Sequence, residues 1–102
     1  LAARILELIN LDTSGTFHCC NSGEPATWFD VARAALDDAG RSDVELIPVT
    51  VAELGLPAPR PAFSAMRCLR SEALGLAPMR PWRDAIKAFA AEAAIGPRPA
   101  PK

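Results

Sequence analysis

An arginine and a serine on a proline-rich segment are the residues of this chain best suited to bind a ligand. Arg60 lies between Pro59 and Pro61, and Ser64 follows shortly after. A guanidinium forms forked, charge-assisted hydrogen bonds to a phosphate, and a serine hydroxyl can bond to a sugar. The flanking prolines reduce the entropy that is lost when the segment becomes ordered. Arg60 and Ser64 are therefore our candidate binding residues; the alternative is an arginine bonded to carbonyls of its own loop.

Residues for catalysis are scarce in this sequence. It has no tyrosine and a single histidine, His18. It contains neither a Gly-x-Gly-x-x-Gly segment nor a P-loop. One histidine within an expected strand gives no basis for a serine–histidine–acid set. The adjacent carboxylates Asp37 and Asp38 are interpreted as solvated residues on a polar helix face. We therefore assign no catalytic and no cofactor-binding residue to this chain.

Three cysteines, Cys19, Cys20 and Cys68, make an odd number. Adjacent residues of a strand point to opposite faces, so we do not expect Cys19 and Cys20 to bridge each other. We expect reduced, partly buried thiols in a cytoplasmic protein. The alternative is a metal site built on His18, Cys19 and Cys20, but no second pair of ligands exists. We predict no metal site.

The composition is that of a globular protein, and its charge is unevenly placed. Half of the residues are apolar and the formal net charge is −1. Residues 1–59 hold three arginines and nine acids, whereas residues 60–102 hold eight basic residues and three acids. The basic half fits either helix-surface arginines or a local positive field for an anionic ligand. Nucleic acid is disfavoured because exposed aromatics are not interleaved with the basic residues. No apolar run is long enough to span a membrane.

The spacing of apolar residues predicts a small α/β domain. The expected helices cover residues 1–9, 28–39, 68–74 and 82–94, and the expected strands cover residues 16–20 and 44–49. Two strands linked by a helix imply a short parallel sheet with a right-handed crossover. A sheet this small would be marginal alone, and the chain begins at Leu1. We therefore expect a piece of a longer protein that has lost a partner surface.

Local signals mark where several elements begin and end. Thr27 and Thr50 each open a capping box, the second of which starts one helical turn. Pro81 is expected at the first position of the last helix. Trp28 is expected in the core, with a ligand platform as the alternative. Residues 96–102 are expected to be a flexible, proline-rich tail that follows a domain of residues 1–95.

The order of several motifs resembles one known family. The motifs are Gly15–His18, Thr27–Ala32, Pro48–Val49, Arg60–Met66, Glu72–Leu76 and Arg80–Ala85. In this order they resemble the C-terminal part of dTDP-4-dehydrorhamnose reductases, which belong to the extended short-chain dehydrogenase/reductase superfamily. The resemblance covers residues 1 to about 92 and is most specific at Arg60–Ser64 and at Leu74–Ala85.

The resemblance implies a parent reductase that converts dTDP-4-dehydro-L-rhamnose to dTDP-L-rhamnose. Its N-terminal Rossmann domain would carry the NADPH or NADH site and a Tyr-x-x-x-Lys catalytic pair, and neither is present here. This chain would then be the substrate-binding part, inactive alone and without bound cofactor. Arg60 and Ser64 match loop residues of the family, and Arg60 is the candidate for the diphosphate. The implied partners are a dTDP-sugar, the missing Rossmann domain and, as an option, a second copy in a homodimer.

Three residues of the same region depart from the family pattern. The family usually has an acidic residue at the position of Arg67, a lysine at that of Arg70 and an apolar residue at that of Ser71. These departures keep two alternatives open. One is a non-catalytic regulatory relative of the same fold that binds a partner protein. The other is a different nucleotide-sugar epimerase or reductase.

Overall fold

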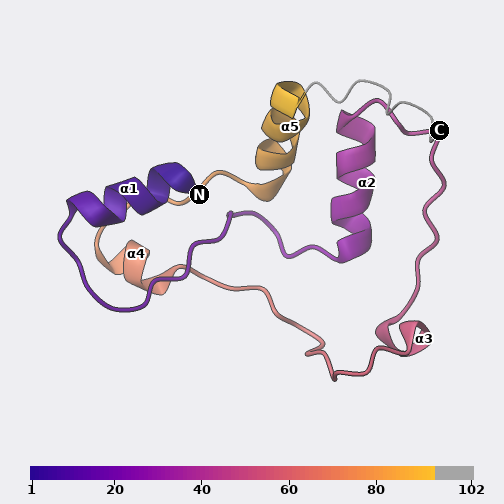
Figure 1. Cartoon of the computed structure of the whole chain (residues 1–102), viewed down its shortest axis with the longest axis horizontal. Coiled ribbons are helices and arrows are strands. Elements are labelled where there is room, and N and C mark those ends of the chain that lie inside the picture. Colours follow the sequence, from indigo (N-terminus) through magenta and orange to yellow (C-terminus); the bar gives the residue numbers. More distant parts are fainter. Residues whose placement is uncertain (94–102) are drawn as a thin grey trace, which may run out of the picture.

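Helices and long connecting segments make up residues 1–93, the part of the chain that this computed structural model describes. In chain order the helices are α1 (Ala2–Asn10), α2 (Trp28–Asp38), α3 (Val51–Leu54), α4 (Leu69–Ala73) and α5 (Trp82–Ala93) (Figure 1). The predicted helices are confirmed to within one residue at each described end, including the short turn after Thr50. Pro81 immediately precedes α5 instead of opening it. The predicted tail over residues 96–102 lies outside the described residues.

The predicted parallel sheet is wrong, and with it the α/β fold class. Residues 1–93 contain no β-strand, and their only β-pairing is an isolated parallel bridge between Ser22 and Pro81. A strand is stable only where its backbone N–H and C=O groups pair with a neighbouring strand. The two predicted strands, residues 16–20 and 44–49, do not pair with each other. The described part of the chain is therefore helices joined by loops.

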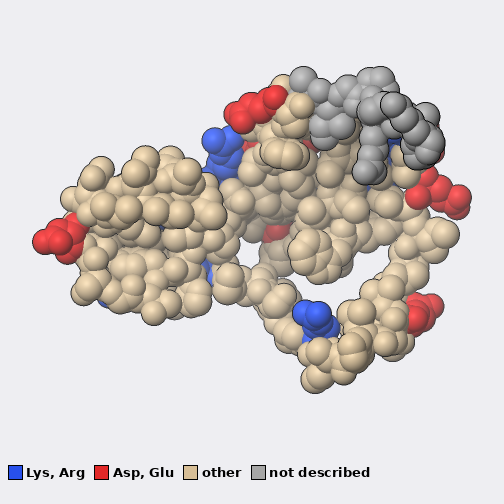
Figure 2. Space-filling model, in the orientation of Figure 1, with Lys and Arg blue, Asp and Glu red and all other residues tan. Residues whose placement is uncertain are grey.

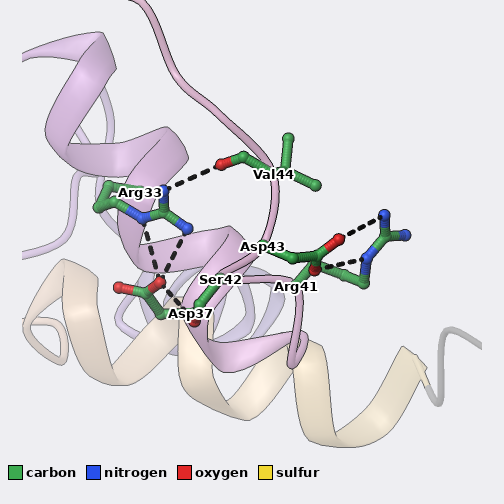
Figure 3. A network of polar contacts seen from close by, with 6 residues as sticks. All are labelled: Arg33, Asp37, Arg41, Ser42, Asp43 and Val44. Carbon is green, nitrogen blue, oxygen red and sulfur yellow. Dashed lines mark hydrogen bonds and ion pairs between the residues drawn. The ribbon is translucent and has the colours of Figure 1, made fainter.

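A side chain of α2 forms a hydrogen bond with the backbone of the segment where the second strand was expected. The guanidinium of Arg33 donates from Nη1 to the carbonyl of Val44 at 3.2 Å and pairs with Asp37 at 2.9 Å (Figure 3). The hydroxyl of Ser42 donates to the same Asp37 oxygen at 2.9 Å. The Val44 carbonyl is thus bonded to a helix side chain instead of to a strand. This network fixes the chain as it leaves α2.

Threonine side chains begin α2 and α3, as their capping boxes predict. The hydroxyl of Thr27 accepts from the backbone N–H of Asp30 at 3.1 Å, and the Asp30 carboxylate accepts from the N–H of Thr27 at 2.9 Å. Thr50 and Glu53 repeat the exchange at 3.2 and 2.6 Å. Each pair satisfies backbone donors that a helix start leaves without partners.

Backbone and side-chain hydrogen bonds join residues 21–24 to residues 79–82, and we call this region the junction. The N–H of Ser22 donates to the carbonyl of Arg80 at 3.2 Å, and the N–H of Trp82 donates to the carbonyl of Ser22 at 2.9 Å. The Ser22 hydroxyl donates to Met79 at 2.7 Å, and the Trp82 indole N–H donates to Glu24 at 2.9 Å. The junction lies just before both α2 and α5, so it sets these two helices side by side (Figure 1).

Arginines make the corresponding connections around α1 and α4. Arg4, which is buried, donates to the carbonyl of Ala77 and pairs with Glu7 at 3.0 Å. Arg70 of α4 donates through two nitrogens to the carbonyls of Ser14 and Thr16, at 3.0 and 3.2 Å. Charged donors thus tie α1 and the segment that follows it to α4 and the segment that follows α4.

A closed hydrophobic core is absent from residues 1–93. None of their apolar side chains is buried, and Trp28 is 89% exposed, so the expectation that Trp28 lies in the core is wrong. The radius of gyration is 17.3 Å, whereas a compact domain of about 100 residues has about 13 Å. Large apolar side chains are exposed at the start of and along α1 and in the second predicted strand: Leu1, Ile5, Leu6, Ile9, Ile47 and Val49. Within residues 1–93, no helix has the length and apolar character that crossing a membrane requires.

Gly15 offers a direct test of the Arg70 contacts. Its φ of +103° disfavours any side chain, and an added Cβ would fall in the space of the Arg70 guanidinium. We predict that Gly15→Ala lowers the free energy of unfolding by more than about 1 kcal/mol, since such backbone conformations cost L-residues ~1–2 kcal/mol before any clash. Urea unfolding followed by tryptophan fluorescence measures the loss.

Gly40→Ala is the matched control, because Gly40 also has a positive φ, +70°, but open space around it. Gly40→Ala has the cost of a positive φ without a clash. Its free energy of unfolding should therefore fall by less than that of Gly15→Ala. Equal losses for both variants would show that the Arg70 contacts contribute nothing.

Candidate functional site

The candidate binding residues lie on the longest run of exposed residues in the described part of the chain. Every residue from 51 to 67 is exposed, and both Arg60 and Ser64 belong to this stretch. Figure 1 shows the stretch passing from α3 to α4 at a distance from the other helices, and Figure 2 shows open space between it and the rest of the molecule. We refer to residues 55–67, which join α3 to α4, as the outer loop.

Arg60 keeps its donors available for a ligand within the described structure. The arginines found in ion pairs there are others: Arg4, Arg33, Arg41 and Arg67. Side-chain hydrogen bonds occur on either side of Arg60 at Glu53 and Arg67, and no bond joins Arg60 or Ser64 to another described residue. The alternative that Arg60 bonds to carbonyls of its own loop is therefore not found in residues 1–93. The assignment of Arg60 and Ser64 to a ligand stays a prediction.

Contacts of sulfur atoms hold the C-terminal end of the outer loop. The thiol of Cys20 donates to the carbonyl of Met66 at 3.3 Å, and the N–H of Cys20 donates to Sγ of Cys68, also at 3.3 Å. All three cysteines are half-buried, as predicted. Burial, with a smaller contribution from the bond to Cys68, raises the pKa of the Cys20 thiol. Within residues 1–93 no cluster of possible ligands could hold a metal ion.

Of the three departures from the family pattern, two make polar contacts within the chain and one is buried. Arg67 pairs with Glu72 at 2.6 Å, which raises the pKa of Arg67. Arg70 bonds two backbone carbonyls and lies over the ring of Phe17, 4.5 Å from its centroid. Ser71 is only 2% exposed. These residues build the region around α4, and Arg67 and Arg70 have roles there that need no partner protein.

A shallow hollow beside the junction was not predicted from the sequence. Its walls combine an indole, a carboxylate and a guanidinium, since Arg83 lies over the Trp82 ring at 4.5 Å and Asp30 faces the same space. It is lined by Gly23, Glu24, Pro25, Ala26, Asp30, Pro81, Trp82 and Arg83. The sequence signal for the hollow is the Gly23-Glu24-Pro25 turn, whose Gly23 has a φ of +109° and approaches the indole closely.

The described residues do not bring these features together into one site. Arg60 and Ser64 lie on the outer loop, whereas the hollow lies at the junction. A second hollow near α4 is lined by Thr13, Ser14, Phe17, Arg70, Ala73 and Leu74. The arrangement offers cations and hydroxyls of a kind that can bind an anionic ligand.

Comparison with protein families gives the class of this chain. The model of the RmlD substrate binding domain matches residues 1–95. The chain therefore belongs to the RmlD substrate binding domain family, which confirms the resemblance found in the order of its motifs. No solved structure matches the chain significantly.

Curated relatives share this segment at moderate identity. A probable dTDP-4,6-dihydroxy-2-methyloxan-3-one 4-ketoreductase of Streptomyces antibioticus is 38% identical over 73 residues, which are 72% of this chain and 24% of the relative. The dTDP-4-dehydrorhamnose reductase of Mycolicibacterium smegmatis is 36% identical over 73 residues, 72% of this chain and 22% of that enzyme. The spore coat polysaccharide biosynthesis protein SpsK of Bacillus subtilis is 32% identical over 92 residues, 90% of this chain and 31% of that protein. The chain thus spans at most about a third of these relatives.

The first turn of α2, at the edge of the junction hollow, should respond to acid. Hydrogen bonds from Thr27 lower the pKa of the Asp30 carboxyl, with a minor contribution from Arg83. A carboxyl whose pKa is lowered by folding stabilises the folded state above its ordinary pKa, about 3.9 for aspartate. That stabilisation is lost as the pH falls through the lowered value. We predict that the first turn of α2 loosens in this acid range, as measured by the NMR shift and exchange rate of the Asp30 amide.

Asp30→Asn is the control for this titration. It keeps an oxygen acceptor but removes the ionisable group, so the acid-dependent step of the amide signal should disappear. A step of unchanged size in this variant would assign the titration to another group.

Proposed function

We propose that this chain is the substrate-binding part of an NADPH-dependent reductase that converts dTDP-4-dehydro-L-rhamnose to dTDP-L-rhamnose. The observation that carries the proposal is the match of the RmlD substrate binding domain to residues 1–95. Relatives named dTDP-4-dehydrorhamnose reductase, among them those of Mycolicibacterium smegmatis and Streptomyces griseus, support it. The proposed product places the protein in nucleotide-sugar synthesis in the cytoplasm.

The outer loop supplies the proposed contacts to the nucleotide-sugar. A diphosphate offers paired oxygens that suit the forked donors of a guanidinium, and the exposed side chain of Arg60 has such donors available. Ser64 follows Arg60 on the same exposed stretch, where its hydroxyl can meet a sugar hydroxyl. We assign the diphosphate to Arg60 and the sugar side to Ser64.

The hydride donor and the proton donor of this reaction would come from outside this chain. We propose a Rossmann domain of the parent protein that binds NADPH or NADH and supplies a Tyr-x-x-x-Lys pair; this sequence has no tyrosine. The exposed apolar side chains of α1, such as Ile5 at 45% and Ile9 at 68%, are suited to packing against that domain. A homodimer would be a further use of such surface.

A second candidate is a reductase for another dTDP-linked keto sugar. The relatives favour it, because they include the ketoreductase of Streptomyces antibioticus at 38% identity and a dTDP-4-keto-6-deoxy-D-glucose reductase of Streptomyces niveus at 31%. Both candidates share the dTDP moiety and differ only in the sugar. The regulatory alternative has less support, since Arg67 and Arg70 are engaged inside the chain.

Removal of the Arg60 guanidinium should weaken binding of dTDP-sugars. In the complete reductase, a desolvated charge-assisted contact contributes roughly 1.5–3 kcal/mol, so Arg60→Ala should raise the Kd about 10- to 150-fold. Arg60→Lys keeps the positive charge but lacks the forked donors, so its Kd should lie between those of the unaltered protein and of Arg60→Ala. Isothermal titration calorimetry with dTDP-sugar gives each Kd.

Arg41→Ala is the matched control, because Arg41 is also an exposed arginine but pairs with Asp43 at 3.2 Å. Its Kd should equal that of the unaltered protein. An unchanged Kd for Arg60→Ala would remove Arg60 from the binding site.

Turnover should require the part of the protein that carries the dinucleotide. We predict that this chain alone oxidises no NADPH in the presence of dTDP-4-dehydrorhamnose, whereas the complete reductase does so. Absorbance of NADPH measures both. A parallel assay with a dTDP-4-keto-6-deoxyhexose of different configuration separates the two candidates. Turnover by this chain alone would contradict the division of roles proposed here.

A further inference from the structure

Two cysteines distant in sequence lie in contact at the base of the outer loop. The sulfur atoms of Cys20 and Cys68 are 3.5 Å apart. The backbone N–H of Cys20 points at the Cys68 sulfur at 3.3 Å, and the Cys68 sulfur lies 3.7 Å from the carbonyl oxygen of Cys20. Cys19 is the neighbour of Cys20 in sequence, yet its sulfur makes no hydrogen bond with the described residues around it. The fold thus selects one cysteine of the adjacent pair.

We propose that Cys20 and Cys68 form a reversible disulfide, so that this pair is an oxidative modification site of the chain. A disulfide requires the sulfurs to approach to about 2.05 Å, a short movement from their present contact. Both residues lie outside helices and strands: Cys68 immediately precedes α4, and Cys20 lies in the loop before the junction. Both are half-buried, so small oxidants in solution can reach them.

A peroxide is the oxidant class that the proposal requires. The Cys68 thiolate attacks one oxygen of hydrogen peroxide; the O–O bond breaks, Cys68 becomes a sulfenic acid and hydroxide takes up a proton to leave as water. The Cys20 thiolate then attacks the sulfenic sulfur, the S–S bond forms and the S–O bond breaks, releasing a second water. Two thiols lose two electrons and two protons, and the peroxide is reduced to two waters. A dithiol reductant reverses the change.

The order of the two thiols follows from their surroundings. Burial raises the pKa of the Cys20 thiol, which lowers the fraction of Cys20 present as thiolate at neutral pH. Its attack on the sulfenic acid is intramolecular and benefits from the short sulfur–sulfur distance. Oxidation also removes the thiol hydrogen that Cys20 donates to Met66. The covalent bond replaces this contact as the attachment of the C-terminal end of the outer loop.

The adjacent cysteines provide a matched test. Cys19→Ser leaves the pair Cys20 and Cys68, and Cys20→Ser leaves the pair Cys19 and Cys68. In an unfolded chain both pairs close loops of nearly equal length, and closure entropy changes only with the logarithm of length, so both variants should oxidise at equal rates in urea. In native buffer the geometry favours Cys20 alone.

We expect hydrogen peroxide to convert the intact Cys19→Ser chain to an intramolecular disulfide at least about tenfold faster than the Cys20→Ser chain in native buffer. Loss of two hydrogens by mass spectrometry and protection from alkylation measure the rate. The Cys19→Ser chain should also react faster in native buffer than in urea, and a dithiol should restore both thiols. Equal native rates for the two variants, no native advantage for Cys19→Ser, or a disulfide between two chains would each overturn the proposal.

Discussion

The arrangement of the chain depends on the junction, where residues 21–24 and 79–82 exchange hydrogen bonds. These residues are separated by more than half of the sequence, and their pairing is the only β-bridge of the described part. The junction satisfies backbone groups of Ser22 and Trp82 and orients the indole of Trp82 toward Glu24. Because α2 starts shortly after one side and α5 starts on the other, the helices are placed together by the loops that precede them.

Polar contacts hold the segments of the chain together because the described residues bury no apolar side chain. Arg4 reaches the Ala77 carbonyl and Arg70 reaches those of Ser14 and Thr16, so guanidiniums hold segments that a core would otherwise hold. Such contacts exchange water for protein partners and contribute only modest net free energy each. Exposed apolar side chains add little to the stability of the described residues by themselves, because the hydrophobic effect stabilises only where apolar surface is removed from water.

Local physics explains which parts of the fold could be predicted from the sequence. The hydroxyls of Thr27 and Thr50 cap helices through residues three positions away, so the signal and the structure lie in one short segment. The apolar spacing that marks α1 and α5 is local in the same sense. The half-buried state of the cysteines was also foreseen, but not which sulfur of the adjacent pair meets Cys68, because that choice depends on the path of both loops.

Non-local pairing explains what could not be predicted. The apolar run Val44–Val49 is a strand signal, but a strand needs a neighbour, and a sequence pattern does not say whether one is present. Here Arg33 bonds the Val44 carbonyl, and Ile47 is 73% exposed. Trp28 fails as a core residue for the same reason, because an apolar helix face is buried only if something packs on it. The junction hollow was missed because its walls come from segments far apart in the chain.

The exposure of Arg60 limits how strongly this chain alone could bind an anion. A guanidinium in open water gains little from a phosphate, because the attraction is screened and the side chain loses freedom. The same contact is stronger once water is excluded and the effective dielectric falls. Arg60 on the exposed outer loop would therefore contribute most when another surface closes over the ligand. If the dTDP-sugar lies between this chain and the proposed Rossmann domain, the substrate itself completes the closure, and ligand affinity and domain contact become coupled quantities.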